Sequence, residues 1–168
     1  IIAFLLFIIP FWIAINKPLK IKEKVWETLG ILSENILRIP HGLFYSKNHT
    51  WTHLEKSGKA IVGLDDLLVH LTGKVELSDL RAPGERIAKG DYIAVINQDG
   101  KHLKIASPIS GEIQNVNVLL QNKTDAINDD PYGKGWIYKV KPEKWISETY
   151  SYFLADEAIA WSKQELTR

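Results

Sequence analysis

Two histidines and two acidic pairs are the side chains of this sequence whose types and spacing could support chemistry. His49 and His53 flank Trp51 and would lie on one face of an extended segment, as two ligands of a metal ion do. The sequence places no carboxylate or third imidazole nearby, so we predict no metal site. The pairs Asp65-Asp66 and Asp129-Asp130 could act as general acid and base, but a helix cap and turn residues explain them better.

The composition excludes several classes of activity. The 168 residues include no cysteine, which rules out disulfides, thiolate metal sites and a cysteine nucleophile. No glycine-rich phosphate loop, nucleophile elbow or catalytic triad is visible in the sequence. The 21 basic and 20 acidic side chains leave a net charge of +1, too low for a nucleic-acid-binding surface. We therefore predict a protein that is not an enzyme and that does not bind nucleic acid.

A lysine stands directly after a predicted tight turn. The segment Gln98-Asp99-Gly100-Lys101 joins two apolar stretches, Gly90–Ile96 and Ile105–Ile113. Asp-Gly between such stretches is a strong signal for a type I′ β-hairpin, because glycine takes a positive φ without strain. The plain interpretation of Lys101 is a solvated side chain that opens the second strand.

The first residues of the chain are typical of a membrane anchor. The run Ile1–Ile15 has no polar side chain except the indole of Trp12, and a cluster of lysines follows it. As a helix it would be about 22 Å long, short of the roughly 30 Å hydrocarbon core of a bilayer. We expect a transmembrane anchor over residues 1–16 that lacks part of its N-terminus, since the sequence also contains no methionine. A signal peptide or a buried core helix is the alternative.

The lysine cluster also predicts an orientation. Positive charge directly after a transmembrane segment favours the cytoplasmic side, so we expect a single-pass protein of the inner or cell membrane with its folded part in the cytoplasm. The glycosylation sequons at Asn48 and Asn122 would matter only in the opposite orientation.

Residues 17–42 read as a basic and amphipathic connector. Apolar residues recur at helical spacing between Val25 and Ile39, and Pro40 would end this helix. Its apolar stripe either packs on the folded domain or contacts the membrane or a partner subunit. In the second case Trp26 is a candidate partner contact.

Residues 43–142 have the pattern of a β domain. Short apolar segments separated by Gly, Pro and Asp predict strands at Trp51–Glu55, Lys59–Gly63, Val75–Leu77, Tyr92–Asn97, Lys101–Ala106, Glu112–Val118 and Trp136–Lys141. A short internal helix is predicted over Asp65–Leu71, with Asp65 or Asp66 as its N-cap and with Leu67, Leu68 and Leu71 facing inward. The fold class is therefore mainly β, a flattened sandwich or barrel. We also predict core positions on strands for Trp51 and Trp136.

Five segments of this domain carry a resemblance, in the same order, to one family. They are Tyr45–Trp51 (Y-x-x-x-H-x-W), Val62–Gly73 (V-G-I-T-D then A-L-G-D), Gly90-Asp91, Ser107–Ile113 (S-P-V-S-G-E-V) and Asn128–Trp136 (N-E-D-P-Y-G-E-G-W). The domain resembles the glycine cleavage system H protein, which has the lipoyl/biotinyl-carrier hybrid-motif fold. The resemblance implies that fold and, in working members, a lipoyl group on a lysine at the tip of the central hairpin.

The resemblance fails at that lysine. In the family it lies eight residues before the proline of S-P-V-S-G, with a Glu three residues before it. Counted back from Pro108, these places hold Gly100 and Asn97, and Lys101 is one residue late. A shift of one residue turns a side chain to the other face of a strand. We therefore expect no cofactor; the alternative is a lipoyl group on Lys101, with Lys104 a weaker candidate.

Residues 143–168 predict a helical tail. Helices are expected at about Lys144–Phe153 and Asp156–Leu166, the second capped by Asp156. If Trp161 is exposed on this tail, it is a candidate partner contact.

The sequence leaves three functions open. The first is a non-catalytic, membrane-anchored H-protein-like module that acts as a structural or binding subunit of a membrane-associated protein assembly. The second is a membrane-tethered lipoyl carrier that uses Lys101 for a membrane-bound oxidoreductase or a glycine-cleavage-type system. The third is a ligand-sensing domain beside the vacant hairpin, for which the sequence shows no cluster of polar residues.

Overall fold

The computed structural model describes residues 37–98, 100–122 and 125–167. The predicted anchor (1–16), Trp26, Asp99 and all but the end of the connector helix lie outside these residues. At that described end, residues 37–39 are not helical. The chain from Arg38 onward forms one compact unit. Among its described helices, none has the length and apolar character needed to cross a membrane.

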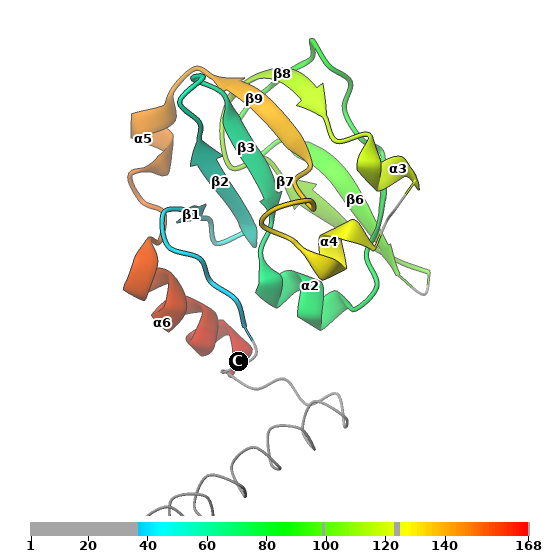
Figure 1. Ribbon diagram of the computed structural model, residues 1–168, viewed down its shortest axis with the longest axis vertical. Coiled ribbons are helices and arrows are strands. Elements are labelled where there is room, and N and C mark those ends of the chain that lie inside the picture. Colours follow the sequence, from blue (N-terminus) through cyan, green and yellow to red (C-terminus); the bar gives the residue numbers. More distant parts are fainter. Residues whose placement is uncertain (1–36, 99, 123–124, 168) are drawn as a thin grey trace, which may run out of the picture. The chain divides into compact units, whose positions relative to one another are not determined.

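Two antiparallel sheets make up the domain (Figure 1). The six-stranded sheet has the order β1 (Phe44–Tyr45), β2 (Thr50–Leu54), β3 (Ala60–Leu64), β9 (Tyr138–Pro142), β8 (Gly111–Val116), β5 (Arg86–Ile87). The three-stranded sheet has the order β4 (Glu76–Ser78), β6 (Tyr92–Gln98), β7 (Lys101–Ala106). The mainly β fold class is thus confirmed. The predicted strands are all present, with bounds shifted by one or two residues at most.

The core lies between the two sheets. Val62 and Ile113 of the large sheet and Ile96 and Ile105 of the small one are buried in a single apolar cluster. Side chains alternate across a strand, so Ile105 of β7 enters this cluster while its neighbour Lys104 is exposed. The hairpin that carries Lys101 is therefore held at its base by the main core.

The internal helix, α2, spans Asp66–Thr72. Its N-cap is Asp65, whose Oδ1 accepts the N–H of Leu68 over 2.8 Å, as predicted. The expectation that Leu71 faces inward is wrong, since Leu71 is 56% exposed and Val69 is buried instead. Only the first turn of this short helix, residues 66–69, is buried.

Four further helices lie in the described part of the domain. They are α3 (Leu119–Asn122), α4 (Ala126–Asp129), α5 (Trp145–Thr149) and α6 (Ala155–Leu166). The prediction of Asp156 as the cap of α6 is wrong, because the N-cap is Leu154 and Asp156 lies in the first turn. Trp136 also departs from prediction, since it precedes β9 and is only half-buried, whereas Trp51 is buried in β2 as expected.

Candidate functional site

The β6–β7 hairpin is the feature that the sequence singled out, and the structure confirms it. Gln98 pairs with Lys101 and Asn97 pairs with His102, so the loop consists of Asp99 and Gly100 alone. Gly100 has a φ of +77°, which only glycine adopts freely. Gly100 therefore has the backbone conformation that the predicted hairpin turn requires.

Gly100 occupies the place where the resembled family has its lysine. A Cβ built on Gly100 would meet no atom within 4 Å, so space is open there and only the backbone conformation disfavours a side chain. Lys101 is exposed but belongs to β7. Alternation along β7 places Lys101 on the same face as Ile105, which is 2% exposed and packs in the core.

Asn97 stands where the family has its Glu, and it ties the hairpin to the neighbouring strands. Its Nδ2 donates to Oγ of Ser78 in β4 over 2.8 Å, and its Oδ1 lies 2.5 Å from Nδ1 of His102 in β7. Both ends of the amide are therefore occupied. The residue crosslinks the small sheet instead of offering a carboxylate beside the turn.

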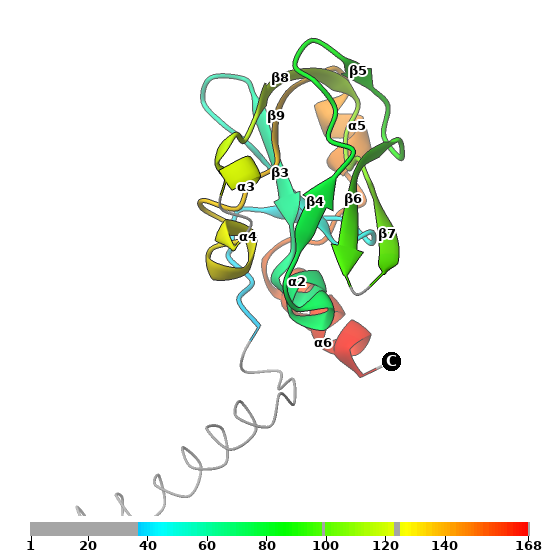
Figure 2. The ribbon, with the colours of Figure 1, turned by 90° about the vertical axis from the view of Figure 1, so that its right-hand side faces the viewer.

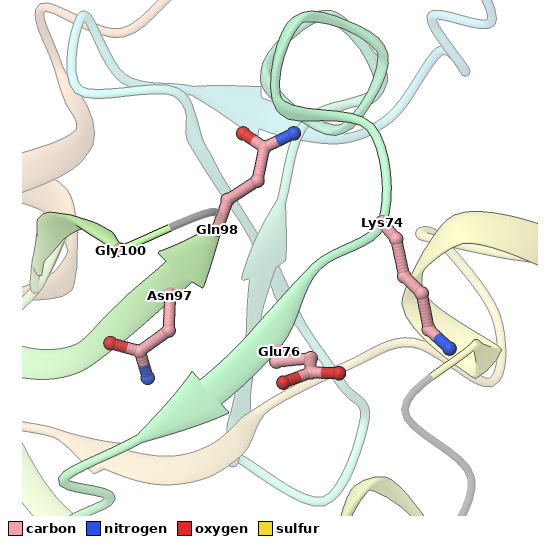
Figure 3. Close-up of a pocket in the computed structure, with 5 residues that line it drawn as sticks. All are labelled: Lys74, Glu76, Asn97, Gln98 and Gly100. Atoms are coloured by element: carbon pink, nitrogen blue, oxygen red, sulfur yellow. The ribbon is translucent and has the colours of Figure 1, made fainter.

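A polar pocket of about 380 Å³ opens beside the turn (Figure 3). It is lined by Lys74, Glu76, Asn97, Gln98 and Gly100. No sequence pattern indicates this cluster, because the pairing of β4 with β6 is what brings Lys74 and Glu76 beside the hairpin. In Figure 3 the side chains of Lys74 and Gln98 point in different directions, so these groups do not converge on one ligand position.

His49 and His53 do not form a metal site. Nδ1 of His49 lies 3.0 Å from Oδ2 of Asp65, while Nδ1 of the exposed His53 lies 3.2 Å from the carbonyl oxygen of Gly42. Over the residues that the structure describes, no three His, Cys, Asp or Glu side chains gather as metal ligands would. His49 has a φ of +57° in the turn before β2, so strand alternation does not apply to it.

The environment of His49 shifts its titration. Burial alone would lower its pKa, but the hydrogen bond and the charge of Asp65, with Glu165, raise the pKa above the ordinary value of 6.5. The ring stacks on Trp161 with centroids 5.2 Å apart. His49 thus ties β2, α2 and α6 together.

Asp66 is a structural anchor for the point where the chain enters the domain. Its side chain is buried, and Oδ2 accepts the backbone N–H of Arg38 over 2.7 Å. Nη2 of Arg38 donates to Oδ1 over 3.3 Å. Asp130 is likewise used in a turn, where it accepts the N–H groups of Gly133 and Lys134. The acidic pairs therefore do the structural work that the sequence predicted for them.

The entry point and the hairpin turn lie at opposite ends of α2. Arg38 binds the first residue of α2, and Lys74, just beyond its last turn, lines the same pocket as Gly100. A helix of seven residues is about 10 Å long. Arg38 and the hairpin turn are therefore linked through the two ends of α2.

Trp161 was a candidate partner contact only if it was exposed, and it is buried. It is 8% exposed and packs between His49 and Phe153, so it is not an exposed partner contact. The large apolar side chains that are most exposed in the tail are Ile146 of α5 and Tyr150, which caps its C-terminal end, at 81% and 90%. Neither residue stood out in the sequence as a candidate partner contact.

Comparison with known proteins gives a consistent result. The family model described as "Glycine cleavage H-protein" matches residues 43–165. The glycine cleavage system H protein of Psychrobacter cryohalolentis is 36% identical over 119 residues, covering 71% of this chain and 94% of the relative. That of Thermus thermophilus is 36% identical over 127 residues, covering 71% and 98%. A crystal structure of the H protein from Mycobacterium marinum superposes with a TM-score of 0.65 at 25% identity, covering 74% of this chain and 99% of that one.

Proposed function

The chain belongs to the glycine cleavage H-protein family, and from this premise we propose that it is a non-catalytic binding subunit that presents its β6–β7 hairpin unmodified. The observation that carries the proposal is Gly100 at the turn, eight residues before Pro108, where the family has its lipoylated lysine. Without that lysine the hairpin has no arm for a lipoyl group. The scaffold around it is complete, so the domain keeps a shape that partners can bind.

The position of Lys101 supports this proposal. Lys101 is paired with Gln98 inside the ladder, and its side chain leaves from the face of the hairpin that carries Ile105. A lipoate ligase that reads a lysine by its place on a rigid turn would meet this side chain one residue late and in another direction.

The second candidate function is a lipoyl carrier that uses Lys101. It is favoured by the exposure of Lys101 directly beside the turn and by the family itself. Intact-mass measurement of the chain purified from lipoate-replete cells separates the two functions. No lipoyl increment is expected for the wild type or for Lys101→Arg. An increment that Lys101→Arg removes would establish the carrier and refute the binding subunit.

We further propose that residues 1–16 anchor the protein in the inner or cell membrane and that residues 17–42 connect the anchor to a β domain (43–142) and a helical tail (143–168) in the cytoplasm. The apolar run and the following lysines support this arrangement. Other subunits of a membrane-associated assembly are the expected partners.

Membrane fractionation tests the anchor. The full chain should stay in the membrane pellet after alkaline carbonate extraction, and a variant without residues 1–16 should be released. Extraction of the full chain would contradict the anchor without affecting the hairpin. Purification of the full chain in mild detergent should then recover its partner subunits.

A further inference from the structure

The strand β7 lies at the edge of the small sheet. The order β4-β6-β7 leaves its outer side without a neighbouring strand in the part of the chain that the structure describes (Figure 2). An open edge carries N–H and C=O groups that can pair with another extended chain. The hairpin is therefore able to accept an added strand.

The register shows which groups are available. Gln98 and Lys101 close a two-residue loop and so form a hydrogen-bonded pair. Such pairs alternate along an antiparallel ladder, so the backbone of Leu103 also turns toward β6. The N–H and C=O groups of His102 and Lys104 turn outward.

The side chains of this edge have one sign of charge. Lys101, His102, Leu103 and Lys104 are all exposed, and β7 contains no acidic residue. Leu103 is 45% exposed, and the ammonium of Lys104 lies 4.8 Å from the centroid of the Tyr92 ring, itself 55% exposed. Lysines on an edge strand repel a second copy of the same strand, but they attract an acidic one.

We propose that β7 binds an extended acidic segment of a partner protein as an added antiparallel or parallel strand. Carboxylates of the segment pair with Lys101 and Lys104, its backbone bonds the outward groups of His102 and Lys104, and its apolar side chains cover Leu103 and Tyr92. An anionic lipid surface would use the lysines but not the backbone edge, so the exposed ladder groups favour a peptide. This inference rests on the binding role proposed above and names its partner class.

A labelled peptide with two glutamates three positions apart and valines between them is the probe, since Lys101 and Lys104 are also three positions apart on β7. It is titrated into the full chain in neutral detergent and followed by fluorescence anisotropy. Reversal of both charges in Lys101→Glu/Lys104→Glu should weaken binding by about tenfold or more. The matched control Lys56→Glu changes an exposed lysine in the β2–β3 turn and should leave binding unchanged. Equal binding by all three proteins would overturn the proposal.

A second pair of measurements separates strand addition from charge attraction. The same peptide N-methylated at every residue keeps its charge but has no N–H to donate along either edge, and it should bind about tenfold or more weakly. His102→Pro removes an outward N–H without removing a ladder bond, and it should also weaken binding. Equal binding of the methylated peptide would overturn the proposal even if His102→Pro disturbs the hairpin.

Two further outcomes are distinguishable. Amide shifts of His102 and Lys104 on transfer from phosphatidylcholine to phosphatidylglycerol nanodiscs, without any effect of the peptide, would indicate a lipid surface and refute the proposal. A lipoyl increment on Lys101 would refute the proposed function, while peptide binding would still be decided by the titration. If the peptide does not bind and no lipoyl increment is found, strand addition is refuted and the proposed function with an unmodified hairpin still stands.

Discussion

Arg38 donates its backbone N–H to Oδ2 of Asp66 over 2.7 Å, and its guanidinium reaches Oδ1 of the same carboxylate. The carboxylate is fully buried at the start of α2. This one contact thus fixes where the chain enters the domain. At the other end of α2, Lys74 lines the pocket beside the hairpin turn.

The first prediction concerns this clamp. Asp66→Asn replaces a buried acceptor by a group that also donates, which leaves Arg38 incompletely paired and should lower the free energy of unfolding by about 2–3 kcal/mol. Urea unfolding measures the change. Asp79→Asn is the matched control, because Asp79 is exposed and has a φ of +52° that asparagine tolerates. Equal midpoints for the two variants would contradict the role of the clamp.

The second prediction concerns the close approach of Gly63 to Trp51. A Cβ on Gly63 would lie 2.6 Å from Cε2 of Trp51, so Gly63→Ala should cost about 2–3 kcal/mol and change the tryptophan emission. Gly58→Ala is the comparison, since Gly58 has a φ of +81° but open space, and it should cost only about 1 kcal/mol. Thermal unfolding of both variants measures the two losses of stability. A larger loss for Gly58→Ala than for Gly63→Ala would show that β2 and β3 pack differently.

The third prediction follows from the raised pKa of His49. A group whose pKa is higher in the folded than in the unfolded protein stabilises the fold fully below its unfolded value, here about 6.5, and loses that contribution as the pH rises through the folded value. The urea midpoint should therefore fall with rising pH in this window. His49→Asn keeps a side chain that tolerates the left-handed backbone but removes the charge, and this variant should lack that fall. An identical pH profile in both proteins would contradict the contact with Asp65.

The fourth prediction restores the family's register. Gly100→Lys places a lysine eight residues before Pro108, with open space around it and a cost of about 1–2 kcal/mol for the left-handed backbone. Coexpressed with a lipoate ligase, Gly100→Lys/Lys101→Arg should become lipoylated, as detected by lipoate-specific antibody. Absence of modification in this variant, with the hairpin intact, would show that register is not what prevents it.

The parts of the structure that depend on neighbours in sequence could be predicted. Asp99-Gly100 between alternating apolar residues specified the β6–β7 hairpin, and Asp65 specified the start of α2. The strands β1 and β5 and the helices α3 and α4 have only two to four residues each, too few to show a period. They were missed for that reason.

The parts of the candidate site that depend on long-range contacts could not be predicted. Arg38 and Asp66 are 28 positions apart, and no sequence pattern links them. The same holds for the stacking of His49 on Trp161, which buries a tryptophan that sequence alone left open as a surface contact. The open edge of β7 required the strand order of the small sheet, which pairs β6 with both β4 and β7.

A tryptic peptide map of the native chain from lipoate-replete cells shows whether the hairpin is presented unmodified. Trypsin cleaves after an unmodified lysine, so we expect the peptide Gly90–Lys101 without a lipoyl increment. A lipoylated Lys101 would block cleavage and give Gly90–Lys104 with a lipoyl increment, and that result would refute an unmodified hairpin.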